Sequence, residues 1–258
     1  MNEKLKHSYN PIVSVVIPVH NGERYIEEAI LSVMNQTFQD LELIVIDDCS
    51  DDSTYEILQR LADGNSKMIV EKNSEKSGVA KTRNRGVTLC RGKYIAFLDA
   101  DDVWYPEKLE KQLQLIETEE AALVYTSYEI IDAGGSPCKD PYTVPEHVDF
   151  NSILKENIIG CSTVLLRADI AKTYKFLENY YHEDYCLWLD ILSDGHKAAG
   201  CADLLVKWRL VTNSRSFNKK NSAMYRWKIY REYLGLSLIK SLQLFAFYMI
   251  GGIKKYYR

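Results

Sequence analysis

The chain has 258 residues, of which 46% are hydrophobic and 26% are charged, values typical of a soluble globular protein with one large domain and a full core. Its six cysteines form no Cys-x-x-Cys pair, which argues against a zinc knuckle and suits a reducing cytoplasm. Residues 1–10 are polar, so no signal peptide is expected.

Charge is spread unevenly along the chain, whose net charge is −4. The segment Leu205–Arg258 holds 12 Lys and Arg and one acid, Glu232, so it carries +11 and leaves −15 on the remainder. An acidic body with a basic C-terminal segment predicts an anionic surface as a partner. No nucleic-acid partner is expected, and the sequence leaves the oligomeric state open.

Strand and helix patterns alternate four times in the first ~120 residues. Near-continuous apolar runs predict buried strands, and apolar residues at helical spacing predict the helices between them. The expected elements are a strand at Ile12–Ile17 stopped by Pro18, a helix at about Glu23–Asn35, a strand at Leu41–Ile46, a helix at Thr54–Leu61, a strand at Lys67–Glu71, a helix from Gly78 to about Leu89, a strand at Tyr94–Leu98 and a helix started by Pro106. This alternation predicts an α/β fold with a doubly wound, mostly parallel sheet.

The pattern changes from Ala121 onward. The expected elements are a strand at Leu123–Tyr128, a hairpin or loop over Ile130–Pro145, a helix at Phe150–Asn157, a strand at Ser162–Arg167, a packed helix that begins with His182-Glu183-Asp184, a short strand ending at Lys207–Arg209 and a polar loop over Thr212–Ser216. Two cations near that last loop suit closure over phosphates.

Three carboxylates, Asp99, Asp101 and Asp102, directly follow the apolar run Tyr94–Leu98. Like charges this close repel one another, so a cluster at the carboxyl end of a strand favours a bound cation. Mg²⁺ or Mn²⁺ would take these oxygens together with substrate phosphates, and the alternative is a solvated turn that caps the next helix. No glycine-rich phosphate loop follows any strand, which argues against a dinucleotide or P-loop site.

Two further acids, Glu183 and Asp184, stand at the start of a predicted helix. Acids at a helix N-terminus cap it and compensate its dipole, which would explain both residues. The other interpretation is a carboxylate base at the floor of a pocket.

The C-terminal segment Tyr225–Arg258 combines apolar residues with flanking Lys and Arg. Its longest uncharged apolar run is too short for a membrane span of about 20 residues. The pattern suits either a helix lying in a membrane interface or a helix packed on the body or on a second subunit, and the charge asymmetry favours the membrane.

Five segments stand out as motifs: VSVVIPVHNGERYIEEAILSVMNQTF, ELIVIDDCSDDST, SGVAKTRNRG, GKYIAFLDADDVW and HEDYCLWL. In this order they resemble the motifs of inverting family 2 glycosyltransferases with the GT-A fold, and the resemblance covers about Val13 to Ser216. Five motifs in order are far more specific than any one alone. The chain is most similar to bacterial O-antigen and capsule-repeat β-glycosyltransferases of the β1,3-glucosyltransferase kind.

The resemblance implies a role for individual residues at matching positions. These are Pro18, Val19 and His20 at the uridine, Asp48 or its neighbour Asp47 at the uracil, Lys81 and Arg83 at the base or phosphates, Glu23 and Ala100 elsewhere along the nucleotide-sugar, Asp99 at the ribose and the metal, Asp101 at the metal, Asp184 as the base, and Glu183 as the residue that orients it.

The resemblance also implies how the chain is divided. Residues 1–120 would be the nucleotide-sugar-binding half of one GT-A domain, residues 121–218 its acceptor-binding and catalytic half, and residues 219–258 a basic amphipathic helical tail. One position departs from a related pattern, because Ala223 stands where processive synthases carry the Gln of Gln-x-x-Arg-Trp. This departure predicts the addition of a single sugar.

The implied reaction passes a hexose, glucose before galactose, from a UDP-sugar to an undecaprenyl-diphosphate-linked saccharide, with Mn²⁺ or Mg²⁺ as cofactor. The protein would be cytoplasmic and peripheral on the inner face of the bacterial cell membrane. One alternative is a sugar nucleotidyltransferase, for which the expected glycine-rich loop after the first strand is missing. The other is a non-catalytic membrane-surface or complex-assembly protein, against which the intact Asp99, Asp101 and Asp184 stand.

Overall fold

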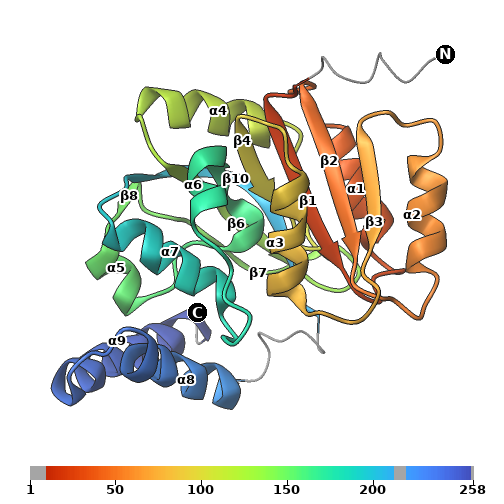
Figure 1. Cartoon of the computed structure of the whole chain (residues 1–258). Coiled ribbons are helices and arrows are strands. Elements are labelled where there is room, and N and C mark those ends of the chain that lie inside the picture. Colours follow the sequence, from red (N-terminus) through yellow and green to blue (C-terminus); the bar gives the residue numbers. More distant parts are fainter. Residues whose placement is uncertain (1–9, 212–218, 257–258) are drawn as a thin grey trace.

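A single sheet of ten strands runs through the computed structural model, which describes residues 10–211 and 219–256 (Figure 1). The strands are β1 Val13–Val19, β2 Leu41–Asp47, β3 Met68–Lys72, β4 Tyr94–Phe97, β5 Val103–Trp104, β6 Leu123–Ile131, β7 Pro137–Tyr142, β8 His147–Val148, β9 Leu165–Arg167 and β10 Ala198–Arg209. Their order is β3-β2-β1-β4-β9-β6-β10-β5, with β7 beside β6 and β8 beside β10. The α/β prediction is confirmed.

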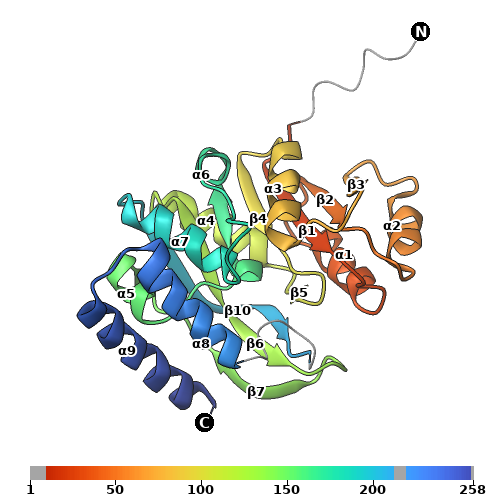
Figure 2. The same cartoon turned by 60° about the horizontal axis from the view of Figure 1, so that its bottom comes forward.

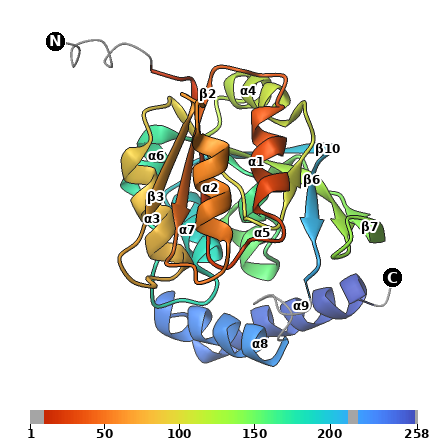
Figure 3. The ribbon, with the colours of Figure 1, turned by 90° about the vertical axis from the view of Figure 1, so that its right-hand side faces the viewer.

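The first four strands in this order are all parallel, and helices cover both of their faces. The helices are α1 Ile26–Met34, α2 Thr54–Ala62, α3 Val79–Leu89, α4 Lys108–Thr118, α5 Phe150–Lys155, α6 Ala168–Thr173 and α7 Glu183–Ser193. Alternate residues of β1 face opposite cores: Val15 and Ile17 belong to the hydrophobic cluster that includes residues of α1, α2 and α4. Val16 belongs to the cluster that includes residues of α3, α5, α6 and α7. Figure 3 shows α1 and α2 on one side of this half.

The second half of the sheet is mixed. Strand β9 runs antiparallel to both of its neighbours, β4 and β6, while β6 and β10 are parallel. The segment over residues 130–145 forms a hairpin, because β7 folds back on β6. The predicted strand at Ser162–Arg167 is shorter than expected, since a 3₁₀ turn, η1 (Cys161–Thr163), precedes β9.

The expectation that Pro18 stops the first strand is wrong. Strand β1 continues to Val19, and Pro18 pairs with Ile46 of β2. The Val16 carbonyl accepts a hydrogen bond from the Leu98 amide, so the backbone polar groups of Val16 face β4. Because every second residue of a strand faces the same neighbouring strand, the backbone nitrogen of Pro18 also faces β4. Pairing with β4 ends at Val16, so the missing amide of Pro18 interrupts no ladder on that side.

The C-terminal tail consists of α8 (Lys219–Lys228), a short π-helix, η3 (Ile229–Tyr233), and α9 (Leu238–Tyr256). Figures 1 and 2 place α8 and α9 beside α5 and α7. Ile229, Tyr230 and Leu244 are buried there, so the tail packs on the body. Within the described residues no helix is long and apolar enough to cross a membrane. The predicted loop Thr212–Ser216 lies outside the described residues.

Candidate active site

The carboxyl ends of β2, β1 and β4 meet at one edge of the sheet, because these strands are adjacent and parallel. Asp48 follows β2, His20 follows β1 and Asp99 lies just beyond β4. This is the edge at which open α/β sheets bind ligands. The topology therefore brings these predicted residues to one side of the molecule.

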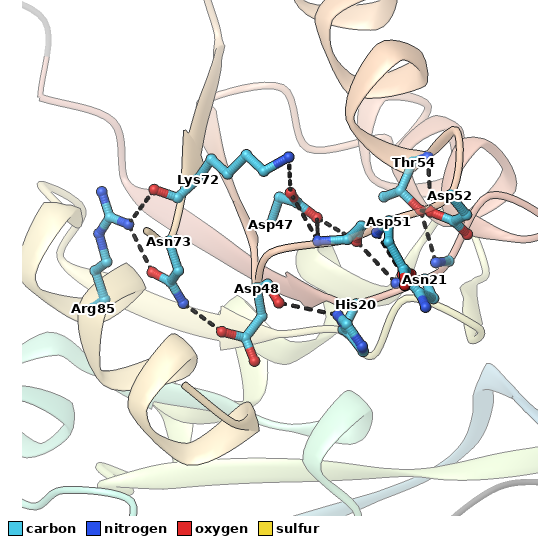
Figure 4. A network of polar contacts seen from close by, with 12 residues as sticks. His20, Asn21, Asp47, Asp48, Asp51, Asp52, Thr54, Lys72, Asn73 and Arg85 are labelled. Carbon is cyan, nitrogen blue, oxygen red and sulfur yellow. Dashed lines mark hydrogen bonds and ion pairs between the residues drawn. The ribbon is translucent and has the colours of Figure 1, made fainter. Parts of the chain in front are cut away.

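The Asp48 side chain joins the loop after β2 to the loop between β3 and α3 (Figure 4). Its Oδ1 accepts hydrogen bonds from Asn73 Nδ2 and the Ser77 amide, both at 2.7 Å, and its Oδ2 accepts one from the Gly78 amide at 2.8 Å. Burial raises the pKa of Asp48, but these hydrogen bonds outweigh it and hold the pKa below its ordinary value. The carboxylate thus fixes the start of α3, where Gly78 has a φ of 85°.

The other residues predicted along the nucleotide-sugar come from the end of β1, the loop after it and α3. Pro18 and Val19 are buried at the end of β1, and His20 Nδ1 lies 3.0 Å from the Asp48 carbonyl. Glu23 accepts a hydrogen bond from the Ser53 amide at 3.0 Å, which links the loops after β1 and β2. Lys81 is exposed on α3.

Arg83 joins the two predicted halves of the site. It is 3% exposed, and its guanidinium contacts Asp99 Oδ1 at 2.5 Å and Glu183 Oε1 at 2.6 Å. Glu183 is as deeply buried, so this ion pair is screened little by water. Arg83 and Glu183 lie 100 positions apart in the sequence, so this ion pair joins α3 to the start of α7.

Asp184 lies in the first turn of α7, where its Oδ1 accepts a hydrogen bond from the Tyr185 amide at 2.7 Å. Burial, and next the charge of Glu183, raise the pKa of Asp184 to about 6, against the lowering charge of Arg83. A carboxyl with a pKa in this range suits general base catalysis near neutral pH.

A pocket of about 290 Å³ brings Arg83, Asp99, Glu183 and Asp184 together. Its wall also includes Tyr128, Lys139, Ser162, Trp208, Arg226 and Tyr248. The remaining predicted residues do not line it: they are Pro18, Val19, His20, Glu23, Asp48, Lys81, Ala100 and Asp101.

The three acids after β4 have different surroundings. Asp102 is buried; its Oδ2 accepts Ser162 Oγ at 2.5 Å and its Oδ1 accepts the Arg209 amide at 2.9 Å. Ser162 Oγ in turn accepts the Asp99 amide at 3.0 Å. Asp102 therefore holds the loop in place, whereas Asp99 remains about one-third exposed.

Asp99 and Asp101 have the chemistry that a divalent cation needs. Burial, followed by the charge of Asp99, raises the pKa of Asp101 to about 6, and a cation between the two would relieve that repulsion. No group of three or more candidate ligands occurs within the described residues. The pair fits an ion that completes its coordination with water and phosphate oxygens, as Mg²⁺ and Mn²⁺ do.

Arg209 was not predicted as a site residue, yet it supports the carboxylate loop. It is buried, its Nε donates to the Asp101 carbonyl at 2.7 Å, and its Nη2 contacts Glu28 at 2.6 Å. Its guanidinium also lies 4.6 Å from the centroid of the Tyr25 ring. No local sequence pattern marks this arginine, because its partners come from distant parts of the chain.

A profile of the family described as "Glycosyl transferase family 2" matches residues 14–184. The chain belongs to glycosyl transferase family 2. The predicted family and catalytic class are thereby confirmed.

Relatives of this family 2 glycosyltransferase match nearly its whole length. TuaG of Bacillus subtilis, whose name assigns it to teichuronic acid biosynthesis, is 35% identical over 248 residues, covering 96% of this chain and 98% of TuaG. WfgD of Escherichia coli, named a UDP-Glc:alpha-D-GlcNAc-diphosphoundecaprenol beta-1,3-glucosyltransferase, is 33% identical over 246 residues, covering 95% of each chain.

Solved structures share the fold. Staphylococcus aureus TarS in complex with UDP-GlcNAc matches with a TM-score of 0.71 at 21% identity, over 92% of this chain and 71% of TarS. The mannosyltransferase PcManGT of Pyrobaculum calidifontis, in complex with GDP-Man and Mn²⁺, matches with a TM-score of 0.67 at 16% identity, over 89% of this chain and 66% of that one. The predicted GT-A fold is confirmed.

Proposed function

We propose that this glycosyltransferase moves a hexose, glucose before galactose, from a UDP-sugar to a lipid-diphosphate-linked saccharide, with inversion, during assembly of O-antigen or capsular repeat units. The observation that carries the proposal is the shared pocket, in which Asp184 and Asp99 face one cavity and Arg83 connects their elements. The activity that the name of WfgD states supports the donor and the acceptor class.

In this proposal Asp184 takes the proton from the acceptor hydroxyl. The hydroxyl oxygen forms a bond to the anomeric carbon as the bond to the UDP phosphate oxygen breaks, and the electron pair leaves with UDP. Attack from the face opposite the leaving group inverts the anomeric centre. Glu183 orients the base through its ion pair with Arg83.

The nucleotide end of the donor would occupy the sheet edge. Pro18, Val19 and His20 would line the uridine, Asp48 would receive the uracil N–H on Oδ2, and Asp99 would face the ribose. Glu23, Lys81, Arg83 and Ala100 would complete the nucleotide-sugar contacts. Asp99 and Asp101 would hold Mn²⁺ or Mg²⁺, which supplies positive charge next to the departing diphosphate.

Substituting the base tests the catalytic assignment. Asp184→Asn removes the proton acceptor and should lower kcat by about 10²–10⁴-fold, while the Kd for UDP stays within about twofold. Transfer to a synthetic GlcNAc-diphosphate-lipid, measured by mass spectrometry, and calorimetric titration of UDP provide the two readouts. Normal turnover by this variant would remove Asp184 from the mechanism.

Two neighbouring acids offer a matched test of the metal site. Asp101→Asn should abolish Mn²⁺-dependent strengthening of UDP binding, because it removes a ligand charge. Asp102→Asn should retain that strengthening, because burial and the charge of Asp101 raise the pKa of Asp102 well above its ordinary value and favour a neutral group there. UDP titrations with Mn²⁺ and with a chelator decide the matter, and equal effects in both variants would contradict the assignment.

The tail would hold the enzyme on the cytoplasmic face of the membrane. Large apolar side chains on α9 are exposed at helical spacing: Leu238, Ile239, Leu242, Phe247, Met249 and Ile250. Together with the +11 charge of the C-terminal segment, this stripe suits the interface of an anionic bilayer. The opposite side of the tail packs on the body, so packing and membrane contact are compatible.

A further inference from the structure

Arg226 is a buried cation on the pocket wall. It belongs to α8, is 3% exposed and lines the same pocket as Asp184. Its Nε and Nη1 atoms are buried without a hydrogen-bond partner. Among the ion pairs of the described residues none includes Arg226.

The other arginines buried in the described part of the chain are paired with acids. Arg83 contacts Asp99 and Glu183, and Arg209 contacts Glu28. A guanidinium is always charged, and burying it without an anion is costly. Arg226 therefore stands apart from these two and has unused capacity to bind an anion that enters the pocket.

Aromatic rings account for only part of the surroundings of Arg226. Its guanidinium carbon lies 3.6 Å from the ring centroid of Tyr185 on α7 and 5.0 Å from that of Tyr248 on α9. Such contacts stabilise the charge through the ring faces. They supply no oxygen lone pair to the N–H groups of Nε and Nη1, which are the donors that bind phosphate oxygens side by side.

We propose that Arg226 binds the diphosphate of the lipid-linked acceptor, an inference that rests on the proposed function. Arg226 packs on Tyr185, the residue next to the proposed base, so it adjoins the place where the acceptor hydroxyl must lie. In the proposed function the donor diphosphate lies at Asp99, which lines the pocket beyond β4, and at Asp101 two residues further on, both on a segment other than α8. The acceptor is therefore the diphosphate-bearing substrate that fits the tail side.

The tail also explains where the lipid would go. Tyr248 of α9 faces Arg226 and lines the pocket, whereas its neighbours Phe247 and Met249 are 55% and 46% exposed. One helix thus contributes an inner residue to the diphosphate site and an apolar outer face. A lipid chain attached to the diphosphate would leave the pocket beside α9 and enter the membrane.

Calorimetric binding of decyl diphosphate, which carries no sugar, tests the inference on the full-length protein. Arg226→Gln should weaken this binding about 10- to 100-fold and leave the Kd for UDP within about twofold, because it removes only charged hydrogen bonds to the acceptor group. The affinity of Arg226→Lys for decyl diphosphate should fall between those of the wild type and Arg226→Gln, since lysine keeps the charge but lacks the planar guanidinium. Arg231→Gln removes an exposed tail charge and is the matched control, with no change expected in either affinity.

Several results would overturn the inference. If Arg226→Gln weakened UDP binding as much as decyl diphosphate binding, Arg226 would be assigned to the donor diphosphate. If Arg226→Gln bound decyl diphosphate as tightly as the wild type, Arg226 would have no role in binding the acceptor diphosphate. Binding of the uncharged decyl maltoside as tight as that of decyl diphosphate would show that only the chain is recognised. If Arg226→Gln fails to fold, Arg226→Lys carries the comparison. These titrations need no turnover, so failure of the proposed transfer reaction would be seen separately.

Discussion

Asp184, the proposed base, shows how neighbouring residues change the pKa of a single carboxyl group. Burial contributes most to its raised pKa, the charge of Glu183 comes next, and Arg83 acts in the opposite direction. Arg83 also forms an ion pair with Glu183 at the start of α7. The same arginine therefore positions this end of the helix and limits the rise in the pKa of Asp184. Asp184, Glu183 and Arg83 therefore act as one electrostatic unit.

This unit predicts a pH dependence. The proposed base works only when deprotonated, so kcat/KM should rise as the pH increases through about 6 and become level above it. Glu183→Gln removes a charge that raises the pKa of Asp184, so the acidic limb should move to lower pH. A pH–rate profile of both proteins measures the limb independently of absolute rate. A limb that stays in place or moves upward would contradict this coupling.

Some residues of the site could be predicted from the sequence and others could not. Asp99, Arg83, Glu183 and Asp184 were named from motifs, and the structure places all four on one pocket. Arg209 and Ser162 were not named, because their contacts with the carboxylate loop join strands that are distant in sequence. Local patterns report which residue types are present, and only pairing of the strands reveals such partners.

Among the elements, the tail packs on the body, which is one of the alternatives that the sequence left open. Tyr230 of η3 is fully buried, and its hydroxyl donates to the Leu154 carbonyl at 2.6 Å. The neighbouring hydroxyl of Tyr233 donates to Asp190 on α7. These contacts attach the tail to the helices behind the pocket, while its outer apolar face remains exposed.

The packing of the tail predicts a graded loss of stability. Tyr230→Ala should lower the free energy of unfolding by about 3–5 kcal/mol, as for other large aromatic truncations in a core. Tyr230→Phe keeps the ring and loses one hydrogen bond, so about 1 kcal/mol is expected. Denaturant unfolding of the two variants gives both values. Wild-type stability in Tyr230→Ala would mean that the tail is not docked in solution.

The boundaries of several strands and helices were predicted closely. Strands β1, β2 and β4 and helix α3 lie within a residue or two of their expected ranges. The short strand β5 and helix α6 were not predicted, because they are too brief to show a period. Strand β10 extends over 12 residues, whereas only a short strand ending at Lys207–Arg209 was expected. The pairing of β10 with β6 contains register shifts, so the strand does not follow one regular pattern along its length.

On the scale of the whole molecule, the sheet unites the two predicted halves. Residues 1–120 and 121–218 contribute strands to the same sheet, joined through β4 and β9. We propose that the division is one of function, with donor contacts in the first half and the base in the second. The tail at residues 219–258 would then complete the acceptor side.

On the scale of the whole molecule, we expect that the proposed membrane attachment can be separated from catalysis. Replacing Ile239, Leu242 and Ile250 together by Ser should reduce sedimentation with phosphatidylglycerol vesicles at least tenfold, because it removes exposed apolar area from α9. Transfer to a water-soluble acceptor should be unchanged. Replacing Leu31 and Leu204, which are exposed outside the tail, provides the control. Vesicle binding that survives the tail substitutions would contradict this membrane surface.

The sequence by itself determined the family, the alternation of buried strands and helices, and the acids and arginine of the motifs, since these depend on local residue types and on their order. The tertiary structure decided how they are combined: Arg83 between Asp99 and Glu183, Asp102 as a support of the loop, and Arg226 beside the proposed base. The physical reason is that burial and charge pairing depend on segments far apart in the chain, which come together only when the sheet and the tail are assembled.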